Sequence, residues 1–282
     1  MPHLHVPTLS LVGVGLLGGS IALACRRGRI AGRIVGCDRP DVLERARACG
    51  MLDEAVTDPC EAMARASLAV FCTPVDRLAD VVGECADACR PGTLLTDVGS
   101  TKSGIVRRLA NRLPPGVSFV GSHPLAGSEK AGPDHARAEL FEGKLVVVTP
   151  AGDPPAAVST VMAFWKALGA RVETMSPEQH DEALAVTSHL PHLVASVLAG
   201  VLPPEWKRLT ATGFRDTTRL AGGSPELWRA IFQSNQPALL AAAAEFRAHL
   251  DRFTDALAQG DGERLRSLLE QGKYVRDSLS EP

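Results

Sequence analysis

Three polar tracts hold the side chains best suited to acid–base and binding chemistry. Ser100 lies just after one expected strand, and His123 lies just after the next. An imidazole exchanges a proton near neutral pH, and a histidine in the setting Gly-Ser-His-Pro is poorly explained by packing. Ser188, His189 and His192 follow on an expected helix, where Ser188 and His192 share a face. These residues predict a site that handles a proton and a polar ligand.

Arginine in residues 212–219 offers a second kind of chemistry. Two arginines flank Asp216 in an otherwise apolar helical region, and the guanidinium of Arg219 suits bidentate recognition of a carboxylate. The alternative is a structural ion pair between Asp216 and Arg219. Ser100 has an alternative as well, because a serine in this position could simply cap the helix that follows.

Pro191 disturbs the helix that carries the two neighbouring histidines. A proline inside a helix lacks the N–H that would bond to the carbonyl of Thr187, and its ring crowds that carbonyl. A distorted helix with two histidines and a serine is an unusual way to build a core. The distortion therefore favours a functional interpretation of this tract.

A strand, a glycine turn and a helix open the chain and predict a phosphate-binding site. An apolar strand leads into the motif GVGLLG at residues 13–18. In such a turn, Gly13 makes the sharp bend, Gly15 lets a pyrophosphate approach the backbone, and Gly18 lets the helix pack on the strand. The phosphates then bind free N–H groups at the helix start, to which Leu16 and Leu17 contribute.

An acid at the end of the second expected strand extends this pattern. Asp38 lies twenty residues after Gly18, where a carboxylate can hydrogen-bond the adenosine ribose hydroxyls of a dinucleotide. A carboxylate there repels a 2′-phosphate, so NAD is the expected cofactor rather than NADP. Arg39 is the complication, because it could pair with that phosphate or stack on adenine. Thr73 and Pro74, which end a later strand, are further expected cofactor contacts.

Strand and helix patterns alternate to about residue 175 and then give way to helices. The alternation predicts an α/β fold with a mostly parallel, doubly wound sheet, and a long polar loop over residues 121–138. A capping box of Ser176 and Gln179, with proline at the first helical position, predicts a helix start. We therefore predict a dinucleotide-binding domain of residues 1–175 and an all-helical domain of residues 176–282.

Composition and charge exclude several classes of protein. The net charge is −2 and 4% of residues are aromatic, so neither nucleic acid nor an anionic membrane is an expected partner. No basic segment precedes the apolar residues 9–25, and no other run approaches 18 apolar residues, so we expect a cytoplasmic protein without a signal peptide or membrane span. Seven cysteines without a CxxC motif predict free thiols rather than disulfides or a metal site.

Two further expectations concern the protein surface. The helical domain is rich in apolar residues, some at one-face helical spacing, so part of its surface is expected to bury against a second subunit. Five histidines have no supporting context and are interpreted as surface residues: His3, His5, His135, His180 and His249.

The tracts, in this order, resemble the prephenate and arogenate dehydrogenases of tyrosine biosynthesis. The resemblance covers nearly the whole chain and rests on GVGLLGGS (13–20), DVGSTK (97–102), GSHPLAGSEKAG (121–132), MSPEQHD (175–181), SHLPH (188–192) and GFRDTTRLA (213–221). The glycine motif alone is shared with many families, whereas the two histidine tracts combined with GFRDTTR are specific. Dehydrogenases of the hydroxyisobutyrate or pyrroline-carboxylate type would call for different polar tracts.

The resemblance implies an NAD-dependent oxidoreductase that converts prephenate to 4-hydroxyphenylpyruvate by oxidative decarboxylation. It also implies a homodimer that joins through the helical domain. By position, His123 would accept the proton of the C4 hydroxyl, while Ser100 would hydrogen-bond the same hydroxyl and help orient the nicotinamide. A non-catalytic dinucleotide sensor would be expected to lack such residues.

The resemblance assigns the remaining polar residues to substrate binding. Arg219 would bind a substrate carboxylate, and His192 with Ser188, next to His189, would meet the substrate side chain. Glu129 and Asp216 would form an ionic gate at the mouth of the site: both residues are present in the matching tracts.

The alternative substrate is arogenate, used alone or together with prephenate, with NADP as the cofactor. Arogenate carries an ammonium where prephenate carries a keto group. A donor imidazole at His192 could hydrogen-bond the keto group, whereas a protonated imidazole would repel the ammonium. Prephenate is therefore the expected substrate.

Overall fold

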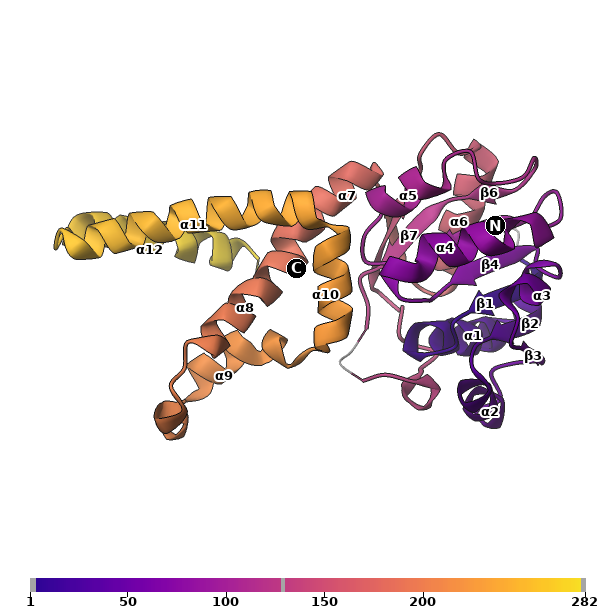
Figure 1. Cartoon of the computed structure of the whole chain (residues 1–282), viewed down its shortest axis with the longest axis horizontal. Helices are drawn as coiled ribbons and strands as arrows, with labels where there is room; N and C mark the ends of the chain where they lie inside the picture. The colour runs from indigo at the N-terminus through magenta and orange to yellow at the C-terminus, as the bar shows by residue number, and fades with distance from the viewer. Residues whose placement is uncertain (1–3, 128–129, 280–282) are drawn as a thin grey trace. The chain divides into compact units, whose positions relative to one another are not determined.

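The computed structural model describes residues 4–127 and 130–279 and divides into two compact units. The first unit ends at Asn235 and holds all of the described strands, and the second begins at Gln236 (Figure 1). The helices of residues 177–235 therefore pack within the first unit. The predicted domain boundary at residues 175/176 follows the change from strands to helices, and it stays a prediction.

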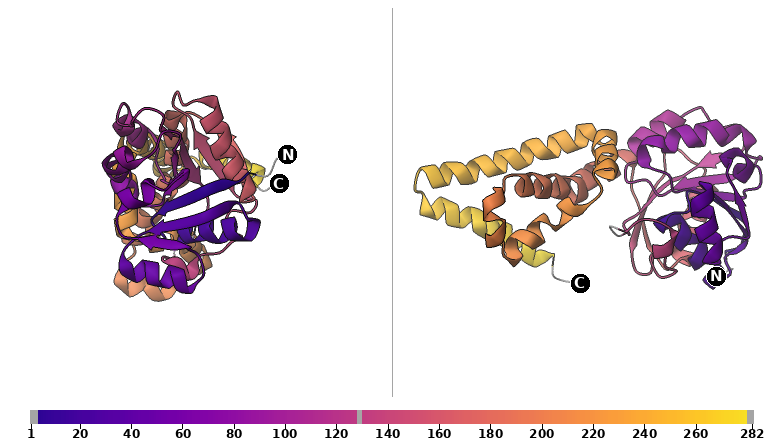
Figure 2. Two further views of the ribbon diagram at one scale, coloured as in Figure 1. Left: turned by 90° about the vertical axis from the view of Figure 1, so that its right-hand side faces the viewer. Right: turned by 60° about the horizontal axis from the view of Figure 1, so that its bottom comes forward.

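A six-stranded parallel sheet forms the centre of the first unit (Figures 1 and 2). Its strand order, β3-β2-β1-β4-β5-β6, confirms the predicted doubly wound α/β fold. In this order a ligand binds beyond the carboxyl ends of the strands, at the point of reversal between β1 and β4. The strands are β1 (Val6–Val12), β2 (Ala31–Cys37), β3 (Glu54–Val56), β4 (Leu68–Phe71), β5 (Leu94–Asp97) and β6 (Ser118–Phe119).

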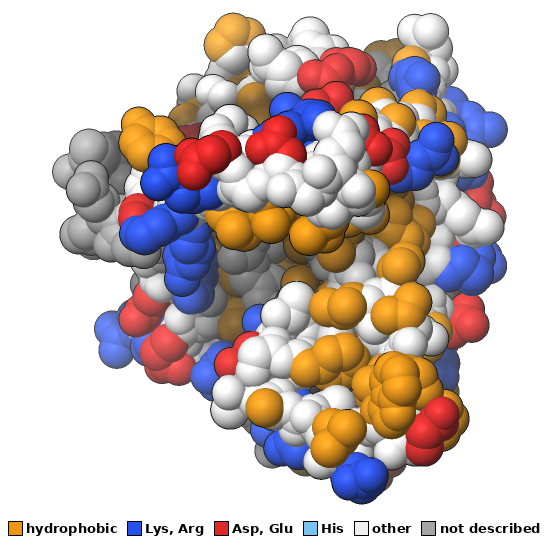
Figure 3. All heavy atoms as spheres, turned by 90° about the vertical axis from the view of Figure 1, so that its left-hand side faces the viewer, with side chains coloured by type: hydrophobic (Ala, Val, Ile, Leu, Met, Phe, Trp, Pro, Cys, Tyr) orange, Lys and Arg blue, Asp and Glu red, His pale blue; other side chains and the backbone are white. Residues whose placement is uncertain are grey.

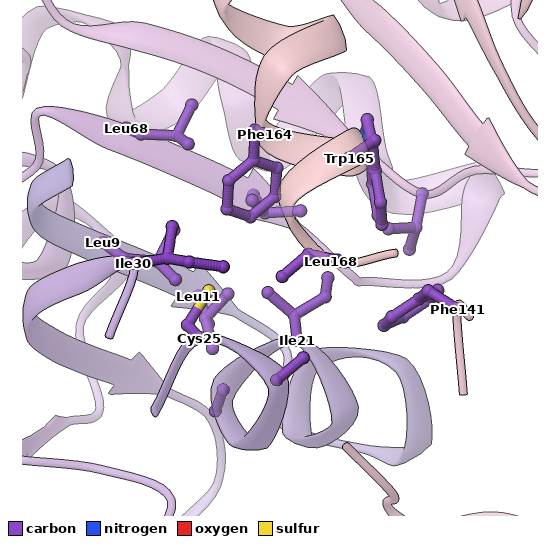
Figure 4. Packing of buried hydrophobic residues seen from close by; sticks show 14 of the residues in the cluster. Leu9, Leu11, Ile21, Cys25, Ile30, Leu68, Phe141, Phe164, Trp165 and Leu168 are labelled. Carbon is purple, nitrogen blue, oxygen red and sulfur yellow. The ribbon is translucent and has the colours of Figure 1, made fainter. Parts of the chain in front are cut away.

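Alternate residues of the strands enter two separate cores. Leu68 and Val70 of β4 belong to one core, while Ala69 and Phe71 belong to the other, as the two-residue period of a strand requires. Figure 4 shows the first core, where Phe164 and its neighbours pack over the sheet. Helices α1 (Leu16–Gly28), α2 (Pro40–Ala48) and α6 (Pro155–Ala167) supply this core, and α3 (Pro59–Met63), α4 (Val75–Cys85) and α5 (Ser103–Leu109) supply the second.

The last three strands form a sheet of their own. β7 (Gly121–Pro124) pairs antiparallel with β8 (Leu145–Thr149), which pairs parallel with β9 (Arg171–Thr174). The prediction of a loop over residues 121–138 is therefore wrong at its start, because residues 121–124 form β7. Gly-Ser-His-Pro has little intrinsic preference for a strand, and pairing with the valines of β8 imposes the extended conformation.

A continuous helix of 24 residues follows the second sheet. It consists of α7 (Pro177–Leu184), the π-helical turn η3 (Ala185–His189) and α8 (Leu190–Gly200). Its capping box forms as predicted, since Ser176 accepts from the N–H of Gln179 and the Gln179 side chain accepts from that of Ser176. The π-helical turn contains Thr187 and ends at His189, two residues before Pro191, so the predicted distortion is confirmed. The unit is completed by η4 (Pro204–Leu209), α9 (Thr212–Thr218), η5 (Arg219–Gly222) and α10 (Pro225–Ser234).

The 24-residue helix has a high mean hydropathy although it contains no continuous apolar run of 18 residues. By length and composition alone it could cross a membrane, although only 28% of its most apolar window is buried. Val197 of α8, with 60% of its surface exposed, shows that apolar side chains remain uncovered.

The second unit is a pair of helices, α11 (Gln236–Ala258) and α12 (Gly262–Ser278), which lie side by side in Figures 1 and 2. Asp261 caps α12 by accepting from the N–H of Arg264. Leu240, Leu250 and Leu257 of α11 are exposed, and Figure 3 shows uncovered hydrophobic side chains on the face it presents. No strand occurs over residues 177–279, all of which are described, so the predicted all-helical C-terminal region is confirmed.

Candidate functional site

The glycine turn between β1 and α1 has the shape that a pyrophosphate requires. Gly13 has φ +96°, and a Cβ there would lie 2.7 Å from the carbonyl oxygen of Cys72. A Cβ on Gly18 would lie 2.0 Å from the carbonyl oxygen of Gly13, so only glycine allows α1 to start this close to the strand. Nothing lies within 4 Å of the corresponding position at Gly15, which leaves the approach to the backbone open.

The start of α1 offers unbound donors to an anion. Gly15 precedes the helix and has no side chain to cap it, so within the described residues the N–H groups of Leu16 and Leu17 gain no acceptor from the cap position. The positive end of the helix dipole lies at the same place. These residues therefore fit the phosphates of a dinucleotide.

Asp38 lies at the end of β2, next to the glycine turn. One carboxylate oxygen accepts from the N–H of Val14 at 2.7 Å, and the other accepts from the N–H of Arg39 at 2.8 Å. These bonds hold the carboxylate beside the turn, and each oxygen keeps a lone pair for another donor. The Arg39 side chain is exposed and lies 3.6 Å from the carboxylate of Asp41.

Thr73 and Pro74 follow β4, on the other side of the reversal point. The hydroxyl oxygen of Thr73 is buried and has no hydrogen-bond partner among the described residues. A buried hydroxyl without a partner is costly in free energy, and a polar group of a bound molecule would remove that cost. The residue types around the reversal point thus fit a dinucleotide cofactor.

A buried chain of hydrogen bonds links His123 to an acid. Nδ1 of His123, on β7, lies 2.9 Å from Nε2 of His180, whose Nδ1 lies 2.8 Å from Oδ1 of Asp181. His180 is fully buried, so its interpretation as a surface residue is wrong. Its burial comes from tertiary contact between α7 and β7, which no local pattern around His180 shows.

The charge of Asp181 decides how the protons in this chain are arranged. Burial acts to raise the pKa of Asp181, but hydrogen bonds from His180 and from the N–H groups of Ser103 and Lys102 outweigh it and hold that pKa below its usual range. The ionised carboxylate accepts from Nδ1 of His180, so Nε2 of His180 accepts from Nδ1 of His123. Nε2 of His123 then carries a lone pair, for which the described residues offer no donor.

His123 itself is held in the neutral form. Its side chain is buried, and this burial, followed by the nearby His180, Lys102 and His189, lowers its pKa well below 6.5. A neutral imidazole with a free Nε2 can accept a proton from a bound hydroxyl.

Ser100 is half-buried in the loop between β5 and α5. The alternative that it caps the helix is wrong, because α5 begins at Ser103 and Asp181 binds the N–H groups of Lys102 and Ser103. Because Asp181 caps α5, the hydroxyl of Ser100 is not needed to cap that helix.

The histidines around the π-helical turn are both buried, and each has a distinct setting. Nδ1 of His189 lies 3.1 Å from Nδ2 of Asn235, and burial lowers the pKa of His189 to about 4. His192 stacks on Trp228, with ring centroids 3.6 Å apart and planes within 14°. Burial also lowers the pKa of His192, and its Nδ1 is buried with no partner in the described chain. Ser188 is half-buried on the turn itself.

His192 and Trp228 also line a cavity of about 410 Å³, together with Ser196, Ala221 and Gly223 among others. The polar nitrogen of His192 and the flat face of Trp228 would suit a ligand with both polar and apolar parts.

Arg219 and Asp216 lie at the surface, Asp216 on α9 and Arg219 at the start of η5. No ion pair joins them within residues 4–127 and 130–279, so the alternative of a structural pair finds no support. Both side chains are available to a ligand. Glu129, the other residue of the expected gate, lies outside the described residues.

Comparison with protein families adds to this geometry. Residues 21–174 match the model of the prephenate dehydrogenase nucleotide-binding domain, and residues 176–271 match that of the prephenate dehydrogenase dimerization domain. The chain belongs to the prephenate dehydrogenase family. This is a family of oxidoreductases, so the predicted class of enzyme is confirmed.

Members of the prephenate dehydrogenase family resemble the chain over nearly its whole length. The prephenate dehydrogenase of Bacillus subtilis is 36% identical, over 96% of this chain and 76% of the relative. The cyclohexadienyl dehydrogenase of Zymomonas mobilis is 35% identical, over 96% and 95% of the two chains. The crystal structure of Aquifex aeolicus prephenate dehydrogenase with hydroxyphenyl propionate and NAD+ superposes with a TM-score of 0.91, at 32% identity over 98% and 99%.

Within this prephenate dehydrogenase fold, three residues that sequence reasoning missed adjoin the expected site. His180 and Asp181 hold His123, and Trp228 stacks on His192. The adjacent His-Asp pair, one turn after a capping box, is the signal that could have indicated the first two.

Proposed function

We propose that the chain catalyses the NAD-dependent oxidative decarboxylation of prephenate to 4-hydroxyphenylpyruvate, a step of tyrosine biosynthesis. The observation that carries this proposal is the buried hydrogen-bond chain from Asp181 through His180 to His123. It leaves a neutral imidazole nitrogen free to accept a proton, which the oxidation of an alcohol needs. Membership of the prephenate dehydrogenase family supports the choice of substrate.

The reaction needs one base and one hydride acceptor. NAD, when bound, accepts the hydride that leaves C4 of the substrate ring. Nε2 of His123 accepts the proton of the C4 hydroxyl, and Ser100 hydrogen-bonds the same oxygen. As the ring carboxylate leaves as CO₂, the electrons of the broken C–C bond move through the ring to the C4 oxygen. That oxygen takes a proton back from His123, and the ring becomes aromatic.

Substrate binding falls to the polar residues of the helical segments. Arg219 binds a substrate carboxylate, a role that its exposed guanidinium, without an ion pair among residues 4–127 and 130–279, supports. His192, with Ser188 and His189, meets the substrate side chain, which the buried Nδ1 of His192, without a hydrogen-bond partner in the described part of the chain, supports. Asp216 and Glu129 form the gate at the mouth of the site.

NAD is the proposed cofactor in preference to NADP. The carboxylate of Asp38 is fixed beside the glycine turn, where it accepts from ribose hydroxyls and repels a 2′-phosphate. Arg39, the one complication, lies near Asp41, which competes with a phosphate for the guanidinium. Asp38→Ser should therefore raise the ratio of NADP to NAD efficiency, and a ratio equal to that of the wild type would contradict this choice.

The alternative substrate, arogenate, remains a competitor because the Zymomonas mobilis relative is a cyclohexadienyl dehydrogenase. Prephenate is proposed because Nδ1 of His192, when it carries the proton, can donate to a keto group. Among the residues that the structure describes, no acidic side chain lines the cavity beside His192 to bind an ammonium.

We also propose a cytoplasmic homodimer with a dinucleotide-binding domain of residues 1–175 and a helical domain of residues 176–282. The exposed leucines of α11 and the match to a dimerization domain support the dimer. All seven cysteines are free, as a reducing compartment would keep them. Light scattering at the elution peak of the purified protein should give twice the mass of the chain.

The decisive experiment is an absorbance assay at 340 nm with purified protein. Prephenate or arogenate is combined with NAD or NADP, giving four reactions, and the product is identified by its spectrum. The highest kcat/KM is expected for prephenate with NAD. A protein that reduces neither cofactor with either substrate would contradict the proposed function.

A further inference from the structure

Lys102 is a charged side chain that the proposed reaction does not use, and it is fully buried. It lies at the end of the loop that carries Ser100, and its ammonium forms an ion pair with Asp97. A buried lysine is rare because removing its charge from water is costly, so its hydrogen bonds must offset that cost. The ammonium of Lys102 also donates to the carbonyl oxygen of Ser122 at 2.8 Å.

Asp97 fixes the same two segments from the other side. Its Oδ1 accepts from the N–H of Ser122 at 3.0 Å, and its Oδ2 accepts from the N–H of Gly99 at 2.8 Å. The ion pair therefore holds the loop of Ser100 against β7, at the residue directly before His123. The hydroxyl of Ser122 receives a further bond from Trp165 at 3.0 Å, which ties this point to α6.

The backbone of Lys102 binds the other end of the hydrogen-bond chain, at Asp181. Its N–H donates to Oδ1 of Asp181 at 2.8 Å, the same oxygen that accepts from His180. His180 in turn contacts His123, and His123 follows Ser122, to which the Lys102 ammonium is bound. Lys102 is thus the residue at which a ring of contacts through Ser122, His123, His180 and Asp181 closes.

We propose that Lys102 is a positioning residue for the proton-accepting histidine, because its side chain and backbone together close a hydrogen-bonded ring that fixes both His123 and the Ser100 loop. This inference rests on the proposed function of that site. The ring holds the imidazole from its backbone end and from its Nδ1 end. As a consequence, Nε2 of His123 is held in one orientation before any ligand binds.

The charge of Lys102 also supports the role of His123 as a base, because it helps to keep the imidazole neutral. The groups that face His123 are His180 and Asp181 on α7, His189 on η3, and Lys102 beside Asp97. A positive charge near an imidazole disfavours protonation, and Lys102 contributes to the lowered pKa of His123. Loss of the ammonium should therefore raise the pKa of His123, so that the histidine becomes protonated at a higher pH.

The test compares Lys102→Met with the double variant Asp97→Asn/Lys102→Met. The single variant leaves Asp97 buried without a partner and is expected to be less stable, whereas the double variant removes both charges and should regain stability. In both variants kcat for prephenate should fall at least about tenfold, with KM and NAD affinity within about threefold of the wild type. Lys166→Met, which removes an exposed lysine from α6, is the matched control and should behave like the wild type.

A second readout does not depend on turnover. The pH titration of the histidine Cε1–Hε1 signals by NMR, with His123 assigned through its absence in His123→Ala, reports the protonation of His123 directly. In Lys102→Met the midpoint should move upward, because a positive charge that disfavours protonation of His123 is lost. A folded double variant with wild-type kcat would overturn the proposal, and so would an unmoved midpoint in Lys102→Met.

Failure of this inference and failure of the proposed function give different results. A wild-type protein that reduces NAD with prephenate, but whose Lys102 variants match it in kcat and midpoint, contradicts the inference alone. A wild-type protein without turnover contradicts the proposed function, and the NMR midpoint then decides whether Lys102 controls His123.

Discussion

The two halves of the proposed substrate site are built in opposite ways. His123 is buried and bound on one side by His180, which is bound in turn by Asp181. Arg219 is exposed, and none of the ion pairs between described residues involves it. The protein alone thus fixes the direction of the base, whereas a ligand must fix that of the guanidinium. Folding therefore supplies the free energy that orients His123, whereas ligand binding must supply the free energy that orients Arg219.

The largest expected effect is the loss of the fixed base. His123→Ala should lower kcat by about 10²–10⁴-fold while leaving NAD affinity unchanged, because proton transfer is lost and the glycine turn is not touched. Stopped-flow or steady-state kinetics with prephenate, beside the melting temperature, measures both. A variant with near-normal kcat and a much lower melting temperature would show that His123 is structural.

The buried half should also have its own dependence of stability on pH. His189 has a pKa of about 4 in the folded protein, against about 6.5 in an unfolded chain. Between pH 6.5 and 4 only the unfolded chain takes up this proton. The contribution of His189 to the free energy of unfolding should therefore be fully present above pH 6.5. As the pH falls to 4, the free energy of unfolding should decrease by up to about 3 kcal/mol.

Urea unfolding of the wild type and His189→Gln at several pH values measures this contribution. Between pH 6.5 and 4 the variant should lose less stability than the wild type, because the contribution of His189 is gone. Some loss should remain, because the lowered pKa values of His123 and His192 still contribute. Equal slopes for the wild type and His189→Gln would rule out the proposed contribution.

The exposed half should affect binding rather than stability. Arg219→Ala should raise KM for prephenate by about 10- to 150-fold, as expected for a charged hydrogen bond worth about 1.5–3 kcal/mol. The melting temperature should not change, because the side chain is exposed. Arg208→Ala removes another exposed arginine and serves as the control. An unchanged KM in Arg219→Ala would show that the carboxylate is bound elsewhere.

The smallest expected effect concerns the choice between prephenate and arogenate. Burial lowers the pKa of His192, so the imidazole is neutral at pH 7 and repulsion of an ammonium does not arise. What remains is a hydrogen bond between neutral groups, worth about 0.5–1.5 kcal/mol, or about a 2- to 10-fold preference for prephenate. His192→Phe keeps a ring against Trp228 and should lose this preference in kcat/KM. A preference that persists would assign it to another residue.

The sequence was sufficient wherever local geometry decides the structure. The glycine turn and the capping box at Ser176 formed as predicted, because a positive φ at Gly13 and the pairing of Ser176 with Gln179 depend on residues a few positions apart. The distorted helix before Pro191 belongs to the same class. In each case the constraint is steric or involves hydrogen bonds between residues a few positions apart.

Tertiary contacts account for what the sequence did not predict. The strand at His123 depends on pairing with Val147, and the burial of His180 depends on a partner 57 positions away. Neither segment has a local preference for the conformation or environment that it adopts. The capping of α5 by Asp181 is of the same kind, since it joins residues 78 and 79 positions apart.

The π-helical turn η3 determines the directions in which side chains before and after it point from the long helix. A π-turn adds one residue to a helix, and each residue of an α-helix advances the phase by about 100°. His180 and Asp181 lie before the turn and face β7 and α5, whereas His192 lies after it and faces α10. The extra residue sets the angular offset between these two sets of side chains. Deleting Val186, an exposed residue of the turn, would rotate one set against the other without removing any side chain assigned to the site.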